Sequence, residues 1–315
     1  MGISQFAKMN SFLTVLLALI QLSCFNVCFG ARKLTSLYQP PPMALTYHNG
    51  ALLEGDLHVT ILWYGKFSPA QKSIVVDFLL SLDRQQKQNV VSSAPSVSQW
   101  WQTIETYMKK AGKKETHVVL ANQVTDENCS MGKTLQRSQL SELAHRVNSE
   151  PGGLVLILTA DDVGVEGFCM SCGFHGSDSQ DKLVFIWVGN SVTQCPGQCA
   201  WPFHQPIYGP QTAPLGAPNE DVGVDGMVEN IASLLAGTVT NPFGNGYFQG
   251  SADAPVEAAS ACPGAYGKGA YPGYAGELLV DSTTGASYNA LGENGRKYLL
   301  PALFDPNTSQ CSTIV

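Results

Sequence analysis

The chain has 315 residues, of which 18 are basic and 25 acidic, and its formal net charge is −7. This balance excludes the basic footprint of proteins that bind nucleic acid or anionic lipid. The length suits one domain at the upper end of the usual size range, with two small domains as the alternative.

The first thirty residues are typical of an export signal. Lys8 supplies a short basic region, residues 12–22 form an apolar stretch, and a small-x-small cleavage pattern precedes Ala31. A membrane anchor is the alternative to an export signal, but a helix that spans a membrane needs about 20 apolar residues, and this stretch is shorter. We expect a signal peptide at residues 1–30, one mature domain at residues 31–315, no membrane span, and secretion.

Two of the nine cysteines lie in the predicted signal, which leaves seven. In an exported chain these favour disulfides over the metal site that their C-x-x-C and C-x-x-x-C spacing also allows. We expect Cys129 to be the unpaired thiol, because it lies far from the others in sequence. The candidates for disulfides are Cys169, Cys172, Cys195, Cys199, Cys262 and Cys311, with pairing inside residues 169–199 and between the last two.

Two N-x-S/T sequons predict glycosylation, at Asn128 and Asn307. Asn307 lies in a polar C-terminal tail and is the better candidate. The sequon at Asn128 contains Cys129.

The first elements are predicted by alternation and by capping signals. Residues 57–63 alternate as a strand with one apolar face. Ser68, a proline at the first turn and Gln71 form a capping box that begins a helix. The same Ser-x-x-Gln signature at Ser96 begins a second helix.

The next segments predict the fold class. A short strand is expected at residues 117–120 and a helix at residues 140–147. Residues 154–158 and 183–188 are continuous apolar runs, which are typical of strands buried on both faces. Strands that alternate with helices predict an α/β fold, a mixed sheet with packed helices.

After the last apolar run the composition changes. Glycine, proline and cysteine dominate as far as about residue 219 and predict a long loop region, and Gly167 and Gly173 indicate a loop around Cys169. One helix is expected at residues 226–240, where the following Asn-Pro ends it. The remainder is rich in Gly, Tyr and Asn and has no long period.

Three segments carry a resemblance to a known family. They are HNGALLEGDLHVTILWYGKFSPAQ (48–71), AWPFHQPIYGPQTAPLGAPN (200–219) and GVDGMVENIASLLAGTVTNPFGNGYFQG (223–250). They closely resemble the plant EXORDIUM and phosphate-induced protein family, over nearly the whole mature chain. The resemblance implies an apoplastic cell-wall protein linked to brassinosteroid-dependent growth and cell expansion, and implies no established reaction.

The helix at residues 226–240 also resembles a zinc-peptidase helix that has lost its ligands. Some secreted metallopeptidases carry H-E-L-x-E-x-x-T-D-P followed by E-x-x-D-x-C. Here Ser233, Leu234 and Gly237 stand at the histidine and the two acidic positions, whereas residues 257–262 keep the glutamate and cysteine of the second motif. Zinc ligands and a catalytic base are therefore missing from the first motif. A degenerate zincin-like scaffold and an ordinary amphipathic core helix both predict no metal cofactor there.

Three carboxylates follow the apolar run at residues 154–158, namely Asp161, Asp162 and Glu166. Carboxylates at the carboxyl end of a strand can serve a glycosidase or bind a cation. They can equally cap turns and stay solvated. This cluster is the basis of a rival hypothesis, a cryptic hydrolase.

The proline-rich segment contains four ring side chains, Trp201, Phe203, His204 and Tyr208. Prolines stiffen the chain and could present the rings as a stacking surface for sugars or peptides. Alternatively, the rings fill the edge of the core. The leading hypothesis is a non-enzymatic growth-promoting protein that binds an unknown cell-wall component or receptor and needs no cofactor.

Overall fold

A computed structural model describes most of the chain. Residues 43–315 form one compact unit, and the predicted signal peptide lies outside the described residues. Within the described part, no helix is both long and apolar enough to span a membrane. The described ranges are residues 42–83, 94–147, 152–178 and 182–315.

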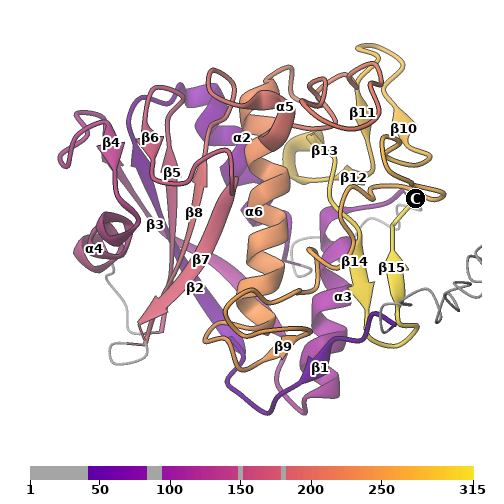
Figure 1. The fold of residues 1–315 in the computed structure, drawn as a ribbon, viewed down its shortest axis with the longest axis horizontal. Coiled ribbons are helices and arrows are strands. Elements are labelled where there is room, and N and C mark those ends of the chain that lie inside the picture. The colour runs from indigo at the N-terminus through magenta and orange to yellow at the C-terminus, as the bar shows by residue number, and fades with distance from the viewer. Residues whose placement is uncertain (1–41, 84–93, 148–151, 179–181) are drawn as a thin grey trace, which may run out of the picture. The chain divides into compact units, whose positions relative to one another are not determined.

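The largest sheet of this unit is mixed and has five strands, in the order β3-β2-β5-β8-β7 (Figure 1). The first four strands run parallel, and the edge strand β7 runs antiparallel to β8. The strands are β2 (Gly55–Tyr64), β3 (Thr116–Asp126), β5 (Leu154–Thr159), β7 (Gly173–Asp178) and β8 (Leu183–Gly189).

The two apolar runs form strands β5 and β8, which are buried along their whole length, as predicted. The strand predicted at residues 57–63 is confirmed as β2, and its second face is buried as well, because residues 59–64 are all buried. This strand lies inside the sheet, between β3 and β5, so both of its faces are covered.

The sequence analysis missed β7, because its glycines and polar residues suggested a loop. A Cβ atom at Gly173 would lie 2.4 Å from the Trp187 carbonyl oxygen and 2.7 Å from the Leu234 side chain. Glycine therefore lets this edge strand lie close to both β8 and the helix beside it.

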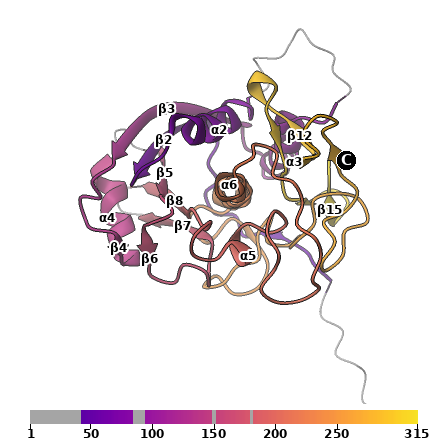
Figure 2. The ribbon, with the colours of Figure 1, turned by 90° about the horizontal axis from the view of Figure 1, so that it is seen from above.

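Three helices follow the predicted signals. In α2 (Pro69–Leu80) the Ser68 side chain accepts a hydrogen bond from the Gln71 backbone N–H, and the Gln71 side chain completes the capping box. Ser96 caps α3 (Val97–Lys110), because its side chain accepts a hydrogen bond from the Gln99 backbone N–H. The amphipathic α4 (Arg137–Val147) packs on β5 and β8, on the opposite side of the sheet from α6 (Figures 1 and 2).

The helix α6 (Val222–Thr240) begins four residues earlier than predicted. Its N-cap is Asp221, whose carboxylate accepts a hydrogen bond from the Val224 N–H at 3.0 Å. The helix lies between the sheet and the C-terminal ladders (Figures 1 and 2). It is therefore buried on most of its surface, including two acidic side chains, Asp225 and Glu229.

The remaining elements are short. The two-stranded ladders are β1-β9, β4-β6, β10-β11, β12-β13 and β14-β15. Their bounds and those of two short helices are β1 (Thr46–Tyr47), β4 (Thr134–Leu135), β6 (Gly164–Val165), α5 (Pro196–Cys199), β9 (Tyr247–Phe248), β10 (Leu279–Val280), β11 (Ser287–Tyr288), β12 (Ala290–Leu291), the 3₁₀ helix η2 (Glu293–Gly295), β13 (Lys297–Tyr298), β14 (Leu303–Asp305) and β15 (Gln310–Ser312).

Candidate binding site around Trp201

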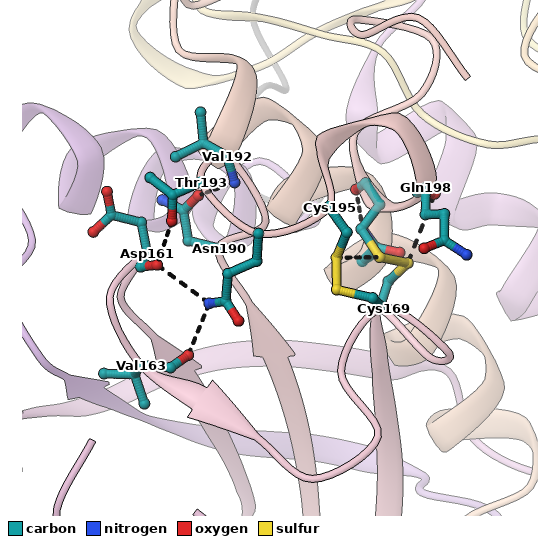
Figure 3. The surroundings of a disulfide bond; sticks show 12 residues. Asp161, Val163, Cys169, Asn190, Val192, Thr193, Cys195 and Gln198 are labelled. Carbon is teal, nitrogen blue, oxygen red and sulfur yellow. Dashed lines mark hydrogen bonds between the residues drawn. A yellow bond between two sulfur atoms is a disulfide. The ribbon is translucent and has the colours of Figure 1, made fainter. Parts of the chain in front are cut away.

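Two crossed disulfides position the start of the proline-rich segment. All six candidate cysteines are paired, and Cys129 is free and buried. The first bond connects the loop before β7 to the N-cap of α5 (Figure 3), and the second connects the same loop to the end of α5. The bonds are Cys169–Cys195, Cys172–Cys199 and Cys262–Cys311.

The end of α5 is also tied to α6. The Asn230 amide donates hydrogen bonds to the Cys199 carbonyl at 3.0 Å and to the Gly226 carbonyl at 2.7 Å. Gly226 itself lies so close to Ala200 that a Cβ atom would be 2.8 Å from the alanine Cβ. Trp201 therefore follows a segment that is fixed on two sides.

Trp201 lines a groove of about 490 Å³ together with Tyr271 and Tyr274. We call this the aromatic groove. The two tyrosines belong to a tight turn in which each backbone N–H donates to the other's carbonyl, and their ring centroids are 5.0 Å apart. Gly273 has a φ of +89° in this turn and contacts Pro210, so a larger residue would be strained there.

The aromatic groove is uncharged and accessible. The exposed fractions are 64% for Tyr271 and 39% for Tyr274. No charged side chain is among the described residues that line the groove, whereas Thr212 and Ser287 offer hydroxyl groups. Apolar walls with a few polar groups are the usual composition of a site for an uncharged ligand.

A second cavity, of about 200 Å³, also has Trp201 in its wall. We call this the Glu229 cavity. Its lining is more polar than that of the groove and includes Glu229, Asn230 and Ser233 of α6 together with Tyr266. Burial raises the pKa of Glu229 well above its ordinary value, and the neighbouring Asp225 acts in the same direction. Burial therefore favours the neutral form of this carboxyl group.

One helical turn beyond Ser233, a carboxylate contacts the helix where Gly237 has no side chain. A Cβ atom there would lie 2.4 Å from Glu257 Oε2. His175 Nε2 is 3.1 Å from both oxygens of this carboxylate, and the Asn241 amide donates to Oε1 at 2.7 Å. Among the described residues, no three His, Cys, Asp or Glu side chains are grouped so as to hold a metal ion.

The structure separates the four ring residues of the proline-rich segment. Only Trp201 lines a cavity. Phe203 is buried in a small core with Tyr266, whereas His204 is exposed and Tyr208 has an exposed fraction of 80%. Phe203 therefore fits the alternative, in which a ring fills the edge of the core, and it does not share a surface with the exposed His204 and Tyr208.

Tyr271, Tyr274 and Glu229 were not predicted from the sequence as residues of these cavities. Tyr271 and Tyr274 flank a Pro-Gly pair, and this turn signal, with a ring on each side, could have identified them. For Glu229 the signal in the sequence is a carboxylate within a largely apolar helix.

The carboxylates of the rival hypothesis make local contacts. Asp162 pairs with Lys133, and the Glu166 carboxylate accepts a hydrogen bond from the Arg137 N–H at the start of α4, at 3.3 Å. The Asp161 backbone carbonyl accepts hydrogen bonds from Thr193 and Gln194 (Figure 3). The Asp162 contact is an exposed ion pair, and the Glu166 contact lies at the start of a helix.

Both predicted glycosylation sites are exposed. Asn128 precedes Cys129, which has a φ of 53° in a turn closed by Asp126. Asn307 lies between β14 and β15, and its N–H donates to the Asp305 carboxylate at 2.8 Å.

The arrangement defines an α/β protein whose two cavities lie along a disulfide-linked segment. Residues 45–314 match the family model described as the phosphate-induced protein 1 conserved region. The chain belongs to this family, and the resemblance found in the sequence is confirmed. No solved structure matches it.

Its curated relatives cover nearly the full length. The chain is 58% identical to Protein PHOSPHATE-INDUCED 1 of Nicotiana tabacum, over 96% of this chain and 98% of that protein. It is 53% identical to Protein EXORDIUM of Arabidopsis thaliana, over 96% of this chain and 100% of that protein. It is also 30% identical to Protein EXORDIUM-like 6 of the same plant, over 82% and 89%.

Proposed function

We propose that this chain is a secreted, apoplastic cell-wall protein that promotes brassinosteroid-dependent growth and cell expansion without catalysing a reaction. It acts by binding an uncharged wall polysaccharide in the aromatic groove. The observation that carries this proposal is the groove itself, in which exposed tyrosine rings and Trp201 line an uncharged space of about 490 Å³.

The chemistry of the groove favours a neutral sugar chain. Flat sugar rings carry apolar C–H faces that stack on aromatic side chains, while their hydroxyl groups can bond to Thr212 and Ser287. A charged polymer would gain no partner from the described lining residues. The shallow placement of Tyr271, with 64% of its surface exposed, suits a long ligand that enters from the side.

Secretion is supported by the three disulfides, which persist in oxidising compartments. Protein isolated from plant wall fluid is expected to begin at or near Ala31. N-terminal sequencing tests this, and an intact Met1 in a cytosolic fraction would contradict it.

The binding proposal is tested with soluble wall polysaccharides. Xyloglucan and arabinoxylan represent neutral polymers and polygalacturonate an acidic one. We expect wild-type protein to retain a neutral polymer in affinity electrophoresis, and the double variant Tyr271→Ala/Tyr274→Ala to lose at least tenfold in affinity. Tyr208→Ala is the matched control, because this tyrosine is more exposed and lines neither cavity.

Three outcomes would overturn the proposal. One is that no neutral polymer binds, and a second is that only polygalacturonate or a proline-rich peptide binds. The third is release of reducing ends during incubation, which would favour the rival hydrolase. Asp162→Asn would then identify whether the carboxylates after β5 are responsible.

The proposal includes a degenerate peptidase scaffold. Two contacts support it, namely Ser233 in the wall of the Glu229 cavity and Glu257 against Gly237. Both involve the positions at which the related motif carries its ligands. If Ser233→Ala abolished a measured peptide hydrolysis, this part would be wrong and the serine would have to be considered as a nucleophile.

A further inference from the structure

We propose that the Glu229 cavity is a second binding site, which takes one small neutral molecule rich in hydroxyl groups, such as a single sugar ring. The site is separate from the aromatic groove, and its ligand need not belong to the polymer proposed above. Of the described residues, Trp201 alone lines both cavities.

The walls of the cavity are fixed before a ligand arrives. Helix α6 supplies Glu229, Asn230 and Ser233, which lie on one side of the helix at positions i, i+1 and i+4. The facing wall includes Cys199, which is held by its disulfide to Cys172 and by the hydrogen bond from Asn230. A pre-organised site loses little conformational freedom on binding.

Glu229 is the observation that points to a ligand. Its side chain is almost fully buried, with an exposed fraction of 5%, and it lines the cavity. Within the described chain, its Oε1 has no hydrogen-bond partner. A buried polar atom without a partner lowers the stability of the fold and calls for an explanation. A small rotation of this side chain into the cavity would let a hydroxyl group of a bound molecule supply the missing partner.

The charge of the site selects the ligand class. A neutral carboxyl group can donate one hydrogen bond and accept others, so it suits hydroxyl groups, which do both. An anion would lie against the Glu229 carboxyl group, which has the second acid Asp225 as a neighbour, and no described lining residue is a cation. A cation would have to ionise Glu229 against the burial that raises its pKa.

Shape and size agree with this class. The cavity of about 200 Å³ has room for several water molecules or one small ligand, and is far smaller than the groove. The rings of Trp201 and Tyr266 lie 5.8 Å apart and inclined by 52°, and they offer apolar surface beside the polar groups. A sugar ring combines both kinds of surface.

Tryptophan fluorescence can report on this cavity. The chain has five tryptophans, and only Trp201 is partly exposed. The exposed fractions of the others are 2% or less, for Trp63, Trp100, Trp101 and Trp187. A change in emission on adding a small ligand therefore reports mainly on Trp201.

The experiment titrates the folded full-length mature protein with glucose, galactose, xylose and arabinose. We expect saturable binding of at least one sugar. Ser233→Leu fills the cavity and should weaken binding more than tenfold, as should Glu229→Leu. Glu229→Gln keeps a neutral donor and acceptor and should stay within threefold of wild type. Tyr274→Ala changes only the aromatic groove and should leave the affinity unchanged.

Circular dichroism and thermal unfolding identify variants that fail to fold, and Glu229→Gln keeps the test decisive because it is nearly isosteric. The inference is overturned if no sugar in the panel binds, or if Ser233→Leu binds as wild type does. It is also overturned if Glu229→Gln loses binding while methylammonium binds the wild type, since the ligand class would then be cationic. Loss in Tyr274→Ala alone would assign the signal to the groove, which also overturns it.

Discussion

The five-stranded sheet and the irregular half of the molecule are stabilised in different ways. By the irregular half we mean residues 190–221 and 241–315, which lie on either side of α6 in the sequence. Strands β5 and β8 are buried from end to end, and their apolar side chains form the main core. The C-terminal ladders contain only two or three residues per strand, too few for such a ladder to be stable alone. Polar side chains and disulfides therefore stabilise these ladders.

Asn289 illustrates how the second region is held. Its amide donates to the Tyr266 carbonyl at 2.9 Å and to the Leu300 carbonyl at 2.7 Å, and its oxygen accepts from the Leu300 N–H at 2.8 Å. One buried side chain thereby connects three segments. Both cavities are lined largely by the irregular half and by α6. The sheet is therefore the scaffold, and the irregular half presents the binding surface.

The largest expected effect on the unfolding free energy comes from removing the Cys262–Cys311 disulfide, which closes a loop of 49 residues. The double variant Cys262→Ala/Cys311→Ala should lose about 4 kcal/mol of unfolding free energy, because the unfolded chain gains freedom. Denaturant unfolding measures the loss, and amide exchange should speed up in β14 and β15 before β5.

Cys129→Ala is the matched control for the disulfide variant. This thiol is buried but unpaired, so its removal should cost only about 1 kcal/mol. Equal losses in the two proteins would show that the bond does not stabilise the C-terminal region.

The next effect tests the contact between the two regions. Leu235 of α6 is 1% exposed in the core between them. Leu235→Ala should lower the unfolding free energy by about 3 kcal/mol, because it removes buried apolar surface and leaves a cavity. Ser233→Ala, on the side of the helix that faces the Glu229 cavity, should change it by less than about 0.5 kcal/mol. A loss below 1 kcal/mol in Leu235→Ala would mean that the helix is not a shared core element.

The same division decides what could be predicted from the sequence. Apolar runs and capping boxes identify β5, β8, α2 and α3, because these elements depend on periodicity and local hydrogen bonds. The edge strand β7 was missed, since close packing at Gly173 leaves no hydrophobic pattern. Tyr271 has a local turn signal, but its position opposite Trp201 was not predictable, because the groove is made by segments some 70 residues apart whose tertiary contacts no local pattern records.

A smaller effect is a dependence of the unfolding free energy on pH. Burial raises the pKa of Asp225 to about 7, although hydrogen bonds from Asn219 oppose the shift. Between pH 4 and 7 the folded chain holds a proton that the unfolded chain has released. Stability should therefore fall as pH rises through this window, by at most about 1.4 kcal/mol per pH unit from this group.

Asp225→Asn should remove this part of the slope and gain relative stability above pH 7. Unfolding midpoints measured at pH 5 and pH 8 test the prediction. Asp253→Asn, at an exposed carboxylate, should keep the wild-type slope. An unchanged slope in Asp225→Asn would mean that the buried carboxyl group ionises without cost.

The smallest effect on stability concerns the glycans, and it sharpens the contrast between the two halves. Asn307 and Asn128 are both exposed, but Asn307 lies in the turn between two short strands of the irregular half, and Asn128 lies beside the buried thiol Cys129 at the end of β3. We expect the main glycan at Asn307, because its turn projects from the C-terminal ladder and no buried side chain follows it directly.

Glycosidase treatment should shift the mobility of wild type and of Asn128→Gln, and hardly that of Asn307→Gln. The unfolding free energy of either variant should stay within about 0.5 kcal/mol of wild type, since a solvated surface side chain makes few contacts that folding depends on. An equal mobility shift in wild type and Asn307→Gln would place the glycan at Asn128, in the turn after β3, and would contradict the prediction.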